Sequence, residues 1–334
     1  MHLWCIYESP TLQIFFLTHG YTDASNSSWM EKLQDRLLLR QGARVLRCGW
    51  SKGAGILHMP YSQAPANIYS NGFNIAGAPG ANRRSLNRVH QHAFPLCAVT
   101  MQREYEAAPF ATLTCIGHSL GAHSCGMAGK MFALGATEQA AGSPLRKKLL
   151  DRIIALDPAG PTFDDALSSP VDNPTRRWRI TPSDAAFVFG LHTDAINTGI
   201  MAFGTAHPVG HLDVYVTPGA LQPLCRRDPW FNVVRRLSCS HSAAIWYLID
   251  SLVSGPGGYA SKHWCAGTPV PFAPTRVTPV PKFPPCNGAA DNTAALQWGI
   301  DAEAPPAQGA SRIVVIPAAD VPSSAHAVID TQRY

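Results

Sequence analysis

Charged residues are scarce in this sequence and never form a long run of one sign. Only 15% of the 334 residues are charged, and the net charge of +5 comes from short clusters such as Arg176-Arg177 and Arg226-Arg227. Nucleic-acid-binding domains usually carry a basic stripe or block. The composition therefore argues against a nucleic-acid partner and is compatible only with mild attraction to an anionic lipid surface.

A long apolar run is also lacking near the N-terminus. Residues 1–10 have no basic start, no apolar core and no cleavage site, and Ile14 to Leu17 is too short for a signal core or a membrane span. We interpret Met1 as a truncated start, from which a signal peptide has been lost.

The nine cysteines include no CxxC and no Cys/His cluster with the spacing of a zinc site. So many cysteines favour disulfides over a metal centre, and hence an extracellular protein. No metal and no other cofactor is expected, and the odd number leaves at least one thiol over.

Short apolar runs alternate with longer segments of helical periodicity, which predicts an α/β fold. Strands are expected at 13–17, 43–48, 110–116, 152–156, 187–191 and 211–216, and helices at 30–39, 61–75, 122–134 and 243–253. Ser28 and Glu31 have the spacing of a capping box before the first helix. This alternation predicts a mainly parallel sheet with helices on both faces.

The stretch GHSLG at residues 117–121 carries the strongest chemical signal, since an apolar run precedes it and a helical segment follows. A GxSxG turn between strand and helix is typical of α/β-hydrolases, where the glycines let the strand and helix approach closely. Ser119 is therefore the candidate nucleophile.

An activated serine needs a base and an acid that orients the base, and in α/β-hydrolases both follow the serine in the order acid, histidine. Asp157 and Asp194 each follow an apolar strand. The abrupt end of the strand before Asp157 favours that residue, but the residues alone leave Asp194 open.

His241 is the favoured base because it lies in a Cys-Ser-His-Ser segment, predicted as a loop that leads into the helix at 243–253. His207 and His211 are predicted to be structural. The oxyanion of acyl transfer needs two backbone N–H donors, for which Leu120 and Tyr21 are the candidates.

Several motifs occur in one order along the chain: HGY at 19–21, GWSKG at 49–53, GHSLGAH at 117–123, LDPAGP at 156–161, SDA at 183–185, HTD at 192–194, GHLDVY at 210–215 and CSH at 239–241. Together they resemble the pancreatic lipase-like family, which includes triacylglycerol lipases and phospholipases A1, and an arthropod-type member with a short lid in particular.

The resemblance implies an α/β-hydrolase fold and a set of functional residues. These are a triad of Ser119, Asp157 and His241, the oxyanion donors Tyr21 and Leu120, and a lid at 226–238 that carries Trp230 and Phe231 and is stapled by a Cys225–Cys239 disulfide. Exposed aromatic residues beside arginines suit insertion into a lipid interface.

The chain also departs from the family pattern. The family's calcium loop resembles residues 179–184, but Thr181 stands where a carboxylate is common, so no calcium is expected.

Residues 1–266 are interpreted as the α/β-hydrolase lipase domain and residues 267–334 as its Pro-rich extension. Since no β-sandwich domain follows, no colipase partner is expected.

The resemblance implies a secreted serine hydrolase that cleaves fatty-acyl esters of acylglycerols at a membrane or droplet interface. A phospholipase A1 is the alternative, favoured by the short lid because an uncovered site admits a polar headgroup. A catalytically silent lipid-binding or yolk-type protein on the same scaffold is the third possibility.

Overall fold

The structure, a computed structural model, describes the sheet and the helices that pack on it. The described residues are 12–55, 60, 61, 63–65, 67, 68, 101, 104, 107–138, 149–164, 178–195, 202–216, 222, 225, 233–252, 300 and 312–316. Among them, no helix is both long enough and apolar enough to span a membrane.

Seven parallel strands form one sheet in the order β2-β1-β3-β4-β5-β6-β7. They are β1 Gln13–Thr18, β2 Ala43–Cys48, β3 Thr112–His118, β4 Leu150–Leu156, β5 Ala185–His192, β6 Leu212–Val216 and β7 Arg312–Ile316. Because all seven are parallel, their carboxyl ends meet at one edge, where α/β proteins gather functional groups.

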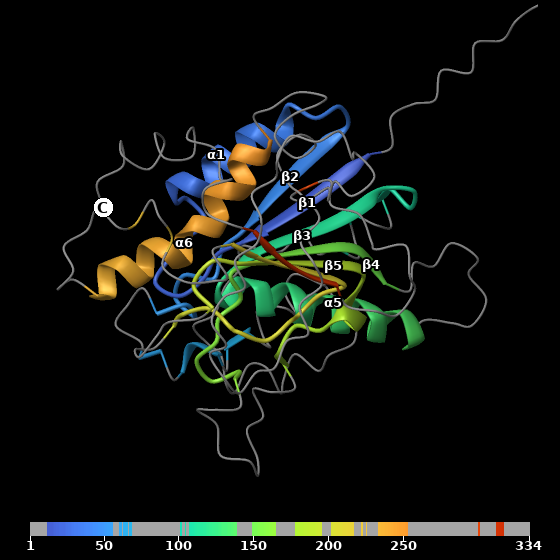
Figure 1. Cartoon of the computed structure of the whole chain (residues 1–334). Coiled ribbons are helices and arrows are strands. Elements are labelled where there is room, and N and C mark those ends of the chain that lie inside the picture. Colours follow the sequence, from blue (N-terminus) through green and yellow to red (C-terminus); the bar gives the residue numbers. More distant parts are fainter. Residues whose placement is uncertain are drawn as a thin grey trace, which may run out of the picture.

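Helices cover both faces of this sheet (Figure 1). The helix α5, Leu120–Glu138, packs on one face, and the helices α1, Ser28–Leu38, and α6, Val233–Ser251, pack on the other. Neighbouring residues of a strand point to opposite faces, so Phe15 and Ile154 join the core under α1 and α6 while Phe16 and Ile153 join the core under α5.

The predicted fold class is confirmed, and the six predicted strands lie within two residues of β1 to β6. Strands that are buried on both faces read as continuous apolar runs, which is why they could be located. The strand β7 was not predicted; it comes from the Pro-rich segment and pairs with β6. The segment at 77–95 and most of the predicted helix at 61–75 lie outside the described residues.

The predicted capping box is wrong. The helix α1 begins at Ser28, its N-cap is Ser27, and no side chain caps it. Glu31 binds Arg47 instead, at 3.3 Å, so its carboxylate turns toward β2 and away from the helix N-terminus.

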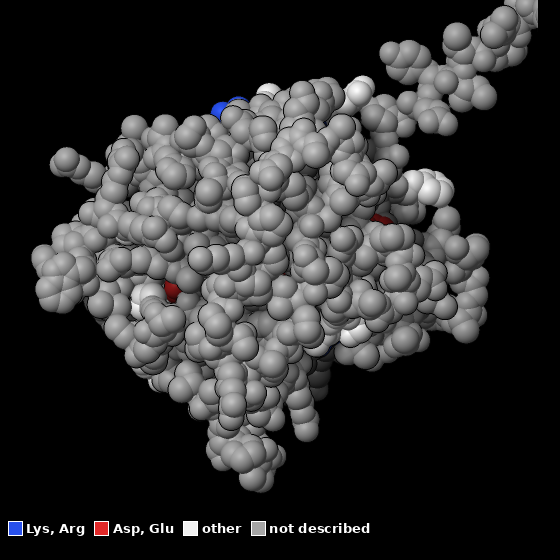
Figure 2. All heavy atoms as spheres, in the orientation of Figure 1, with Lys and Arg blue, Asp and Glu red and all other residues white. Residues whose placement is uncertain are grey.

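On the face shown in Figure 2, the acidic and basic residues among those described reach the surface only at a few separated points.

Candidate active site

Ser119 stands at a sharp turn between β3 and α5. Its φ of 57° is left-handed, and its N–H donates to the carbonyl oxygen of Leu156 at 3.0 Å. A Cβ on Gly117 would lie 2.3 Å from the carbonyl oxygen of Gly121, and a Cβ on Gly121 would lie 2.5 Å from that of Thr18. The two glycines therefore allow the tight turn that lifts Ser119 to the carboxyl edge of the sheet.

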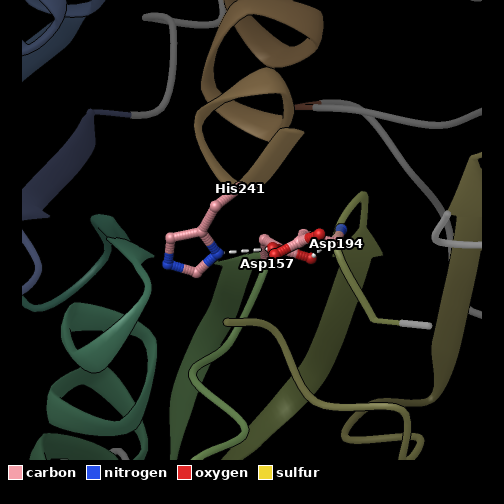
Figure 3. Close-up of side chains that lie close together, drawn as sticks. All are labelled: Asp157, Asp194 and His241. Carbon is pink, nitrogen blue, oxygen red and sulfur yellow. Dashed lines mark hydrogen bonds and ion pairs between the residues drawn. The ribbon is translucent and has the colours of Figure 1, made fainter. Parts of the chain in front are cut away.

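Asp157 and His241 form a buried hydrogen-bonded pair beside this turn. Asp157 is the first residue after β4, and its Oδ2 lies 2.5 Å from Nδ1 of His241. The aspartate is fully buried and the histidine is 9% exposed. Figure 3 shows the other ring nitrogen of His241 pointing away from Asp157, toward the ribbon of β3 and α5.

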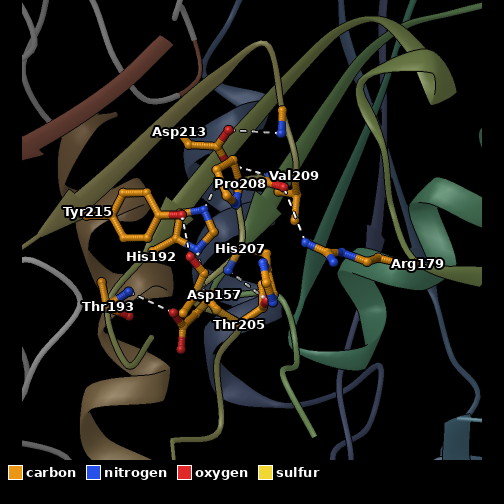
Figure 4. A network of polar contacts seen from close by, with 12 residues as sticks. Asp157, Arg179, His192, Thr193, Thr205, His207, Pro208, Val209, Asp213 and Tyr215 are labelled. Carbon is orange, nitrogen blue, oxygen red and sulfur yellow. Dashed lines mark hydrogen bonds and ion pairs between the residues drawn. The ribbon is translucent and has the colours of Figure 1, made fainter. Parts of the chain in front are cut away.

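Backbone amides hold the second oxygen of the Asp157 carboxylate. Oδ1 accepts hydrogen bonds from the N–H groups of Thr193 at 2.7 Å and Asp194 at 3.0 Å, just beyond the end of β5 (Figure 4). His192 anchors this turn, since its ring binds Asp213 at 2.8 Å and the carbonyl oxygen of Thr205 at 3.1 Å. The HTD motif thus holds the Asp157 carboxylate in a fixed orientation, with one oxygen on the two backbone amides and the other facing His241.

Asp194, the rival carboxylate in the sequence, lies in the same cluster. One oxygen of its carboxylate accepts a hydrogen bond from the N–H of Phe203 at 2.9 Å, while the imidazole bond of His241 goes to Asp157. Ligand-type atoms of these two aspartates and His241 all lie within 4.8 Å of one another. Burial, and then the charge of Asp157, raises the pKa of Asp194 to about 8.

This pKa gives Asp194 a measurable effect on stability. The carboxyl group of Asp194 ionises near 3.8 in the unfolded chain and near 8 in the folded one. The contribution of this group to the stability of the fold is therefore complete below pH 4 and is lost as the pH rises through 8. We expect Tm to fall by roughly 5 °C between pH 5 and pH 9 and this fall to be smaller in Asp194→Asn. Thermal unfolding followed by circular dichroism checks it, and equal pH profiles for both proteins would contradict it.

The prediction that His241 lies in a loop before a helix is wrong. The helix α6 begins at Val233, so His241 stands within it, and the last residues of the segment expected to form a lid are already helical. The first half of α6 contains two arginines and the Cys-Ser-His-Ser segment, and these polar residues interrupt the helical spacing of the apolar ones. A residue within a helix is held more rigidly than one in a loop, which suits a base that must be aimed.

His118 links this helix to the serine turn. Its Nε2–H donates to the carbonyl oxygen of His241 at 3.0 Å, and the centroids of the two imidazole rings lie 4.6 Å apart. Burial, and then the neighbouring His241, lowers the pKa of His118 well below its ordinary value. A neutral His118 therefore fixes the position of α6 relative to Ser119, a role that the sequence did not indicate.

The two candidate oxyanion donors border Ser119. A Cβ on Gly20 would lie 2.7 Å from Cβ of Ser119, so the HGY turn abuts the serine, and Leu120 is the first residue of α5. His19 secures this turn because its Nε2 accepts the N–H of Trp50 at 3.0 Å and its carbonyl oxygen accepts the indole N–H of Trp50 at 2.7 Å. The HGY and GWSKG motifs thus hold each other in place.

The structure contains two disulfides among the described residues. Cys225 pairs with Cys239, as the family resemblance implied, two residues before His241. Cys115 of β3 pairs with Cys125 of α5 and clamps the strand and helix on either side of Ser119, a pairing that the sequence did not predict. Trp230 and Phe231 of the expected lid lie outside the described residues.

Gln222 is a second residue that sequence reasoning missed. Its side-chain amide donates to the carbonyl oxygens of Thr193 at 2.8 Å and Val216 at 2.9 Å, and its side-chain oxygen accepts from Tyr247 of α6 at 3.1 Å. This fully buried side chain joins the ends of β5 and β6 to the helix that carries His241. A single glutamine in a loop has no periodic signal that could have revealed it.

Comparison with known proteins agrees with the motifs and the sheet. A sequence model of the family described as Lipase matches residues 97–266, about half of the chain, which include Ser119, Asp157 and His241. The chain belongs to the pancreatic lipase-like lipase family. Nothing in the matches distinguishes an arthropod-type member.

Three relatives show how far this similarity extends. Lipoprotein lipase of Gallus gallus is 31% identical over 73% of this chain and 43% of its own length. Pancreatic triacylglycerol lipase of Oryctolagus cuniculus is 28% identical over 73% of this chain and 45% of its own length. The inactive pancreatic lipase-related protein 1 of Homo sapiens is 27% identical over 74% and 45%. The chain thus spans less than half the length of these relatives.

Proposed function

We propose that this chain is a serine carboxylic ester hydrolase that cleaves fatty-acyl esters of acylglycerols through an acyl-enzyme. The observation that carries the proposal is the buried pair of Asp157 and His241, 2.5 Å apart, beside a left-handed serine turn. A base oriented by an acid, next to a serine held at a sharp turn, is the arrangement that acyl transfer requires. Membership of the lipase family supports the same reaction class.

In the proposed mechanism His241 takes the proton of Ser119 as the serine oxygen attacks the ester carbonyl. Asp157 accepts the hydrogen bond of the imidazole Nδ1 and stabilises the imidazolium that forms. The N–H groups of Tyr21 and Leu120 stabilise the oxyanion. His241 then protonates the leaving alcohol, and water, activated in the same way, hydrolyses the acyl-enzyme.

Acylglycerols are the proposed substrate, and phospholipids are the second candidate. Kinship with a pancreatic triacylglycerol lipase supports the first. The second is supported by the Cys225–Cys239 disulfide, whose cysteines are only 14 positions apart in the sequence, which limits how much of the site a lid between them can cover. A less covered site leaves room for a charged headgroup, as phospholipase A1 activity requires.

A catalytically silent, lipid-binding protein is the competing class. One relative of this chain is an inactive lipase-related protein, so the scaffold alone does not guarantee activity. The ordered acid–base pair argues for an enzyme. Burying an aspartate bonded to a histidine has a desolvation free-energy cost, and lipid binding alone does not require such a pair.

We further propose that the protein is extracellular and works at a lipid interface. The two disulfides support an oxidising compartment. The apolar residues and arginines of the segment 226–234 suit contact with a lipid surface.

Hydrolysis of emulsified triacylglycerol and of phosphatidylcholine vesicles by the purified protein tests the proposal. We expect fatty acid release from triacylglycerol, with slower or no release from phosphatidylcholine. Release from phosphatidylcholine alone would select the phospholipase A1. Binding to both lipids without hydrolysis, at any pH between 5 and 9, would instead identify a silent lipid-binding protein.

A further inference from the structure

Residues 179–184, called here the 179–184 loop, surround a positive charge that comes from the protein itself. We infer that the ammonium group of Lys130 serves as the built-in cation of this loop, in place of a divalent metal ion. The loop leads directly into β5, whose far end supplies the amide donors of Asp157. What holds the loop therefore supports the strand that orders the site.

Lys130 binds the 179–184 loop through oxygen atoms. Its Nζ donates to Oδ2 of Asp184 at 2.5 Å and to the carbonyl oxygen of Arg179 at 3.0 Å. A carboxylate and a main-chain carbonyl are the ligand types that a hard cation such as Ca²⁺ prefers. An ammonium ion satisfies the same oxygens through hydrogen bonds.

The carboxylate that faces Lys130 is buried, and both of its oxygens already accept hydrogen bonds. The side chain of Asp184 is 1% exposed, and its Oδ2 also accepts the N–H of Thr181 at 2.8 Å. Its Oδ1 accepts the hydroxyl of Thr181 at 3.0 Å. Both carboxylate oxygens are thus engaged by protein donors, and a buried carboxylate needs the compensating charge that Lys130 supplies.

The helix α5 is shaped to bring this ammonium to the loop. A Cβ on Gly126 would lie 2.9 Å from Oδ2 of Asp184, and a Cβ on Gly129 would lie 2.1 Å from the carbonyl oxygen of Asp184. Earlier on the same helix, Nδ1 of His123 accepts the N–H of Ile180 at 3.2 Å. Close approach at the two glycines places Lys130, the next residue, over the loop.

The residues present do not fit a calcium ion. Calcium takes six to eight oxygen ligands and depends on several carboxylates. The 179–184 loop offers a single carboxylate, that of Asp184, and Thr181 contributes only a neutral hydroxyl. Lys130 would also repel a divalent ion from the oxygens that it binds.

Thermal unfolding in millimolar calcium chloride and in EDTA tests this inference. The wild type should have the same Tm in both. Lys130→Met, which keeps an unbranched apolar chain but removes the ammonium group, should lower Tm by roughly 5–10 °C, because it leaves a buried carboxylate unpaired. The double variant Lys130→Met/Thr181→Asp should regain stability in calcium and lose it in EDTA.

Lys52→Met provides the matched control, because Lys52 is an exposed lysine away from the loop. Its Tm should change by no more than about 1 °C. A calcium-dependent Tm in the wild type that disappears in Asp184→Asn would overturn the inference, and so would an unchanged Tm in Lys130→Met. If Lys130→Met fails to fold, the calcium dependence of Tm in the wild type and in Asp184→Asn still decides whether the loop binds calcium.

Discussion

Ser119→Ala is expected to abolish ester hydrolysis and to lower kcat by roughly 10⁵-fold or more, as removal of a serine nucleophile does in other hydrolases. The alanine keeps the turn between β3 and α5, since a methyl group replaces a hydroxymethyl group at the same left-handed position. What is lost is the oxygen that attacks the ester carbonyl. Without it no acyl-enzyme forms, and His241 has no proton to accept.

The measurement is fatty acid release from emulsified triacylglycerol by the variant and the wild type at equal concentration. Ser124→Ala is the matched control, because it removes a buried hydroxyl of α5, which donates to the carbonyl oxygen of Leu120. It should retain activity within about threefold, in line with the small cost of one neutral hydrogen bond. Residual hydrolysis in Ser119→Ala close to that of the control would rule out the serine mechanism.

Asp157→Asn is expected to lower kcat by roughly 10⁴-fold while leaving KM nearly unchanged. A carboxylate accepts a hydrogen bond from Nδ1 of His241, so the other nitrogen is free of a proton and can act as a base. An asparagine amide facing Nδ1 donates instead, which stabilises the opposite tautomer. The imidazole then carries its proton on the side where the serine proton must go.

Asp194→Asn is the comparison that separates the two aspartates. Asparagine retains the oxygen that accepts the N–H of Phe203 and resembles the neutral carboxyl that a pKa of about 8 implies. The loss of kcat should therefore stay below about tenfold. A larger loss for Asp194→Asn than for Asp157→Asn would show that Asp194 is the acid of the triad.

Local signals were sufficient to predict the strands β1 to β6 and the serine turn. Apolar runs marked six strands because parallel strands are buried on both faces, and the flanking strand and helix identified the GxSxG turn. The position of Asp157 after a strand was also visible in the sequence. Asp194 could not be told apart from it by sequence, because Asp194 also lies just beyond the end of a strand, two residues after β5.

Long-range contacts decided what the sequence left open. The hydrogen bond of His241 selects Asp157, and it joins residues 84 positions apart. The start of α6 was predicted too late in the sequence, because the polar residues near the disulfide interrupt the helical spacing of its apolar residues. The later part of α6 packs on the sheet and stabilises the helix as a whole. The pairing of Cys115 with Cys125 depends on how β3 and α5 face each other, which spacing alone does not give.

The amino-acid sequence by itself determined the α/β class, the serine turn and the lipase family of this protein. These depend on periodicity, on glycines at a tight turn and on motifs, all of which are local in the chain. Only the tertiary structure decided which aspartate binds His241, that His118 and Gln222 support the helix carrying it, and that Lys130 neutralises Asp184. Each of these is a contact between distant segments, and its energy exists only once the sheet has brought them together.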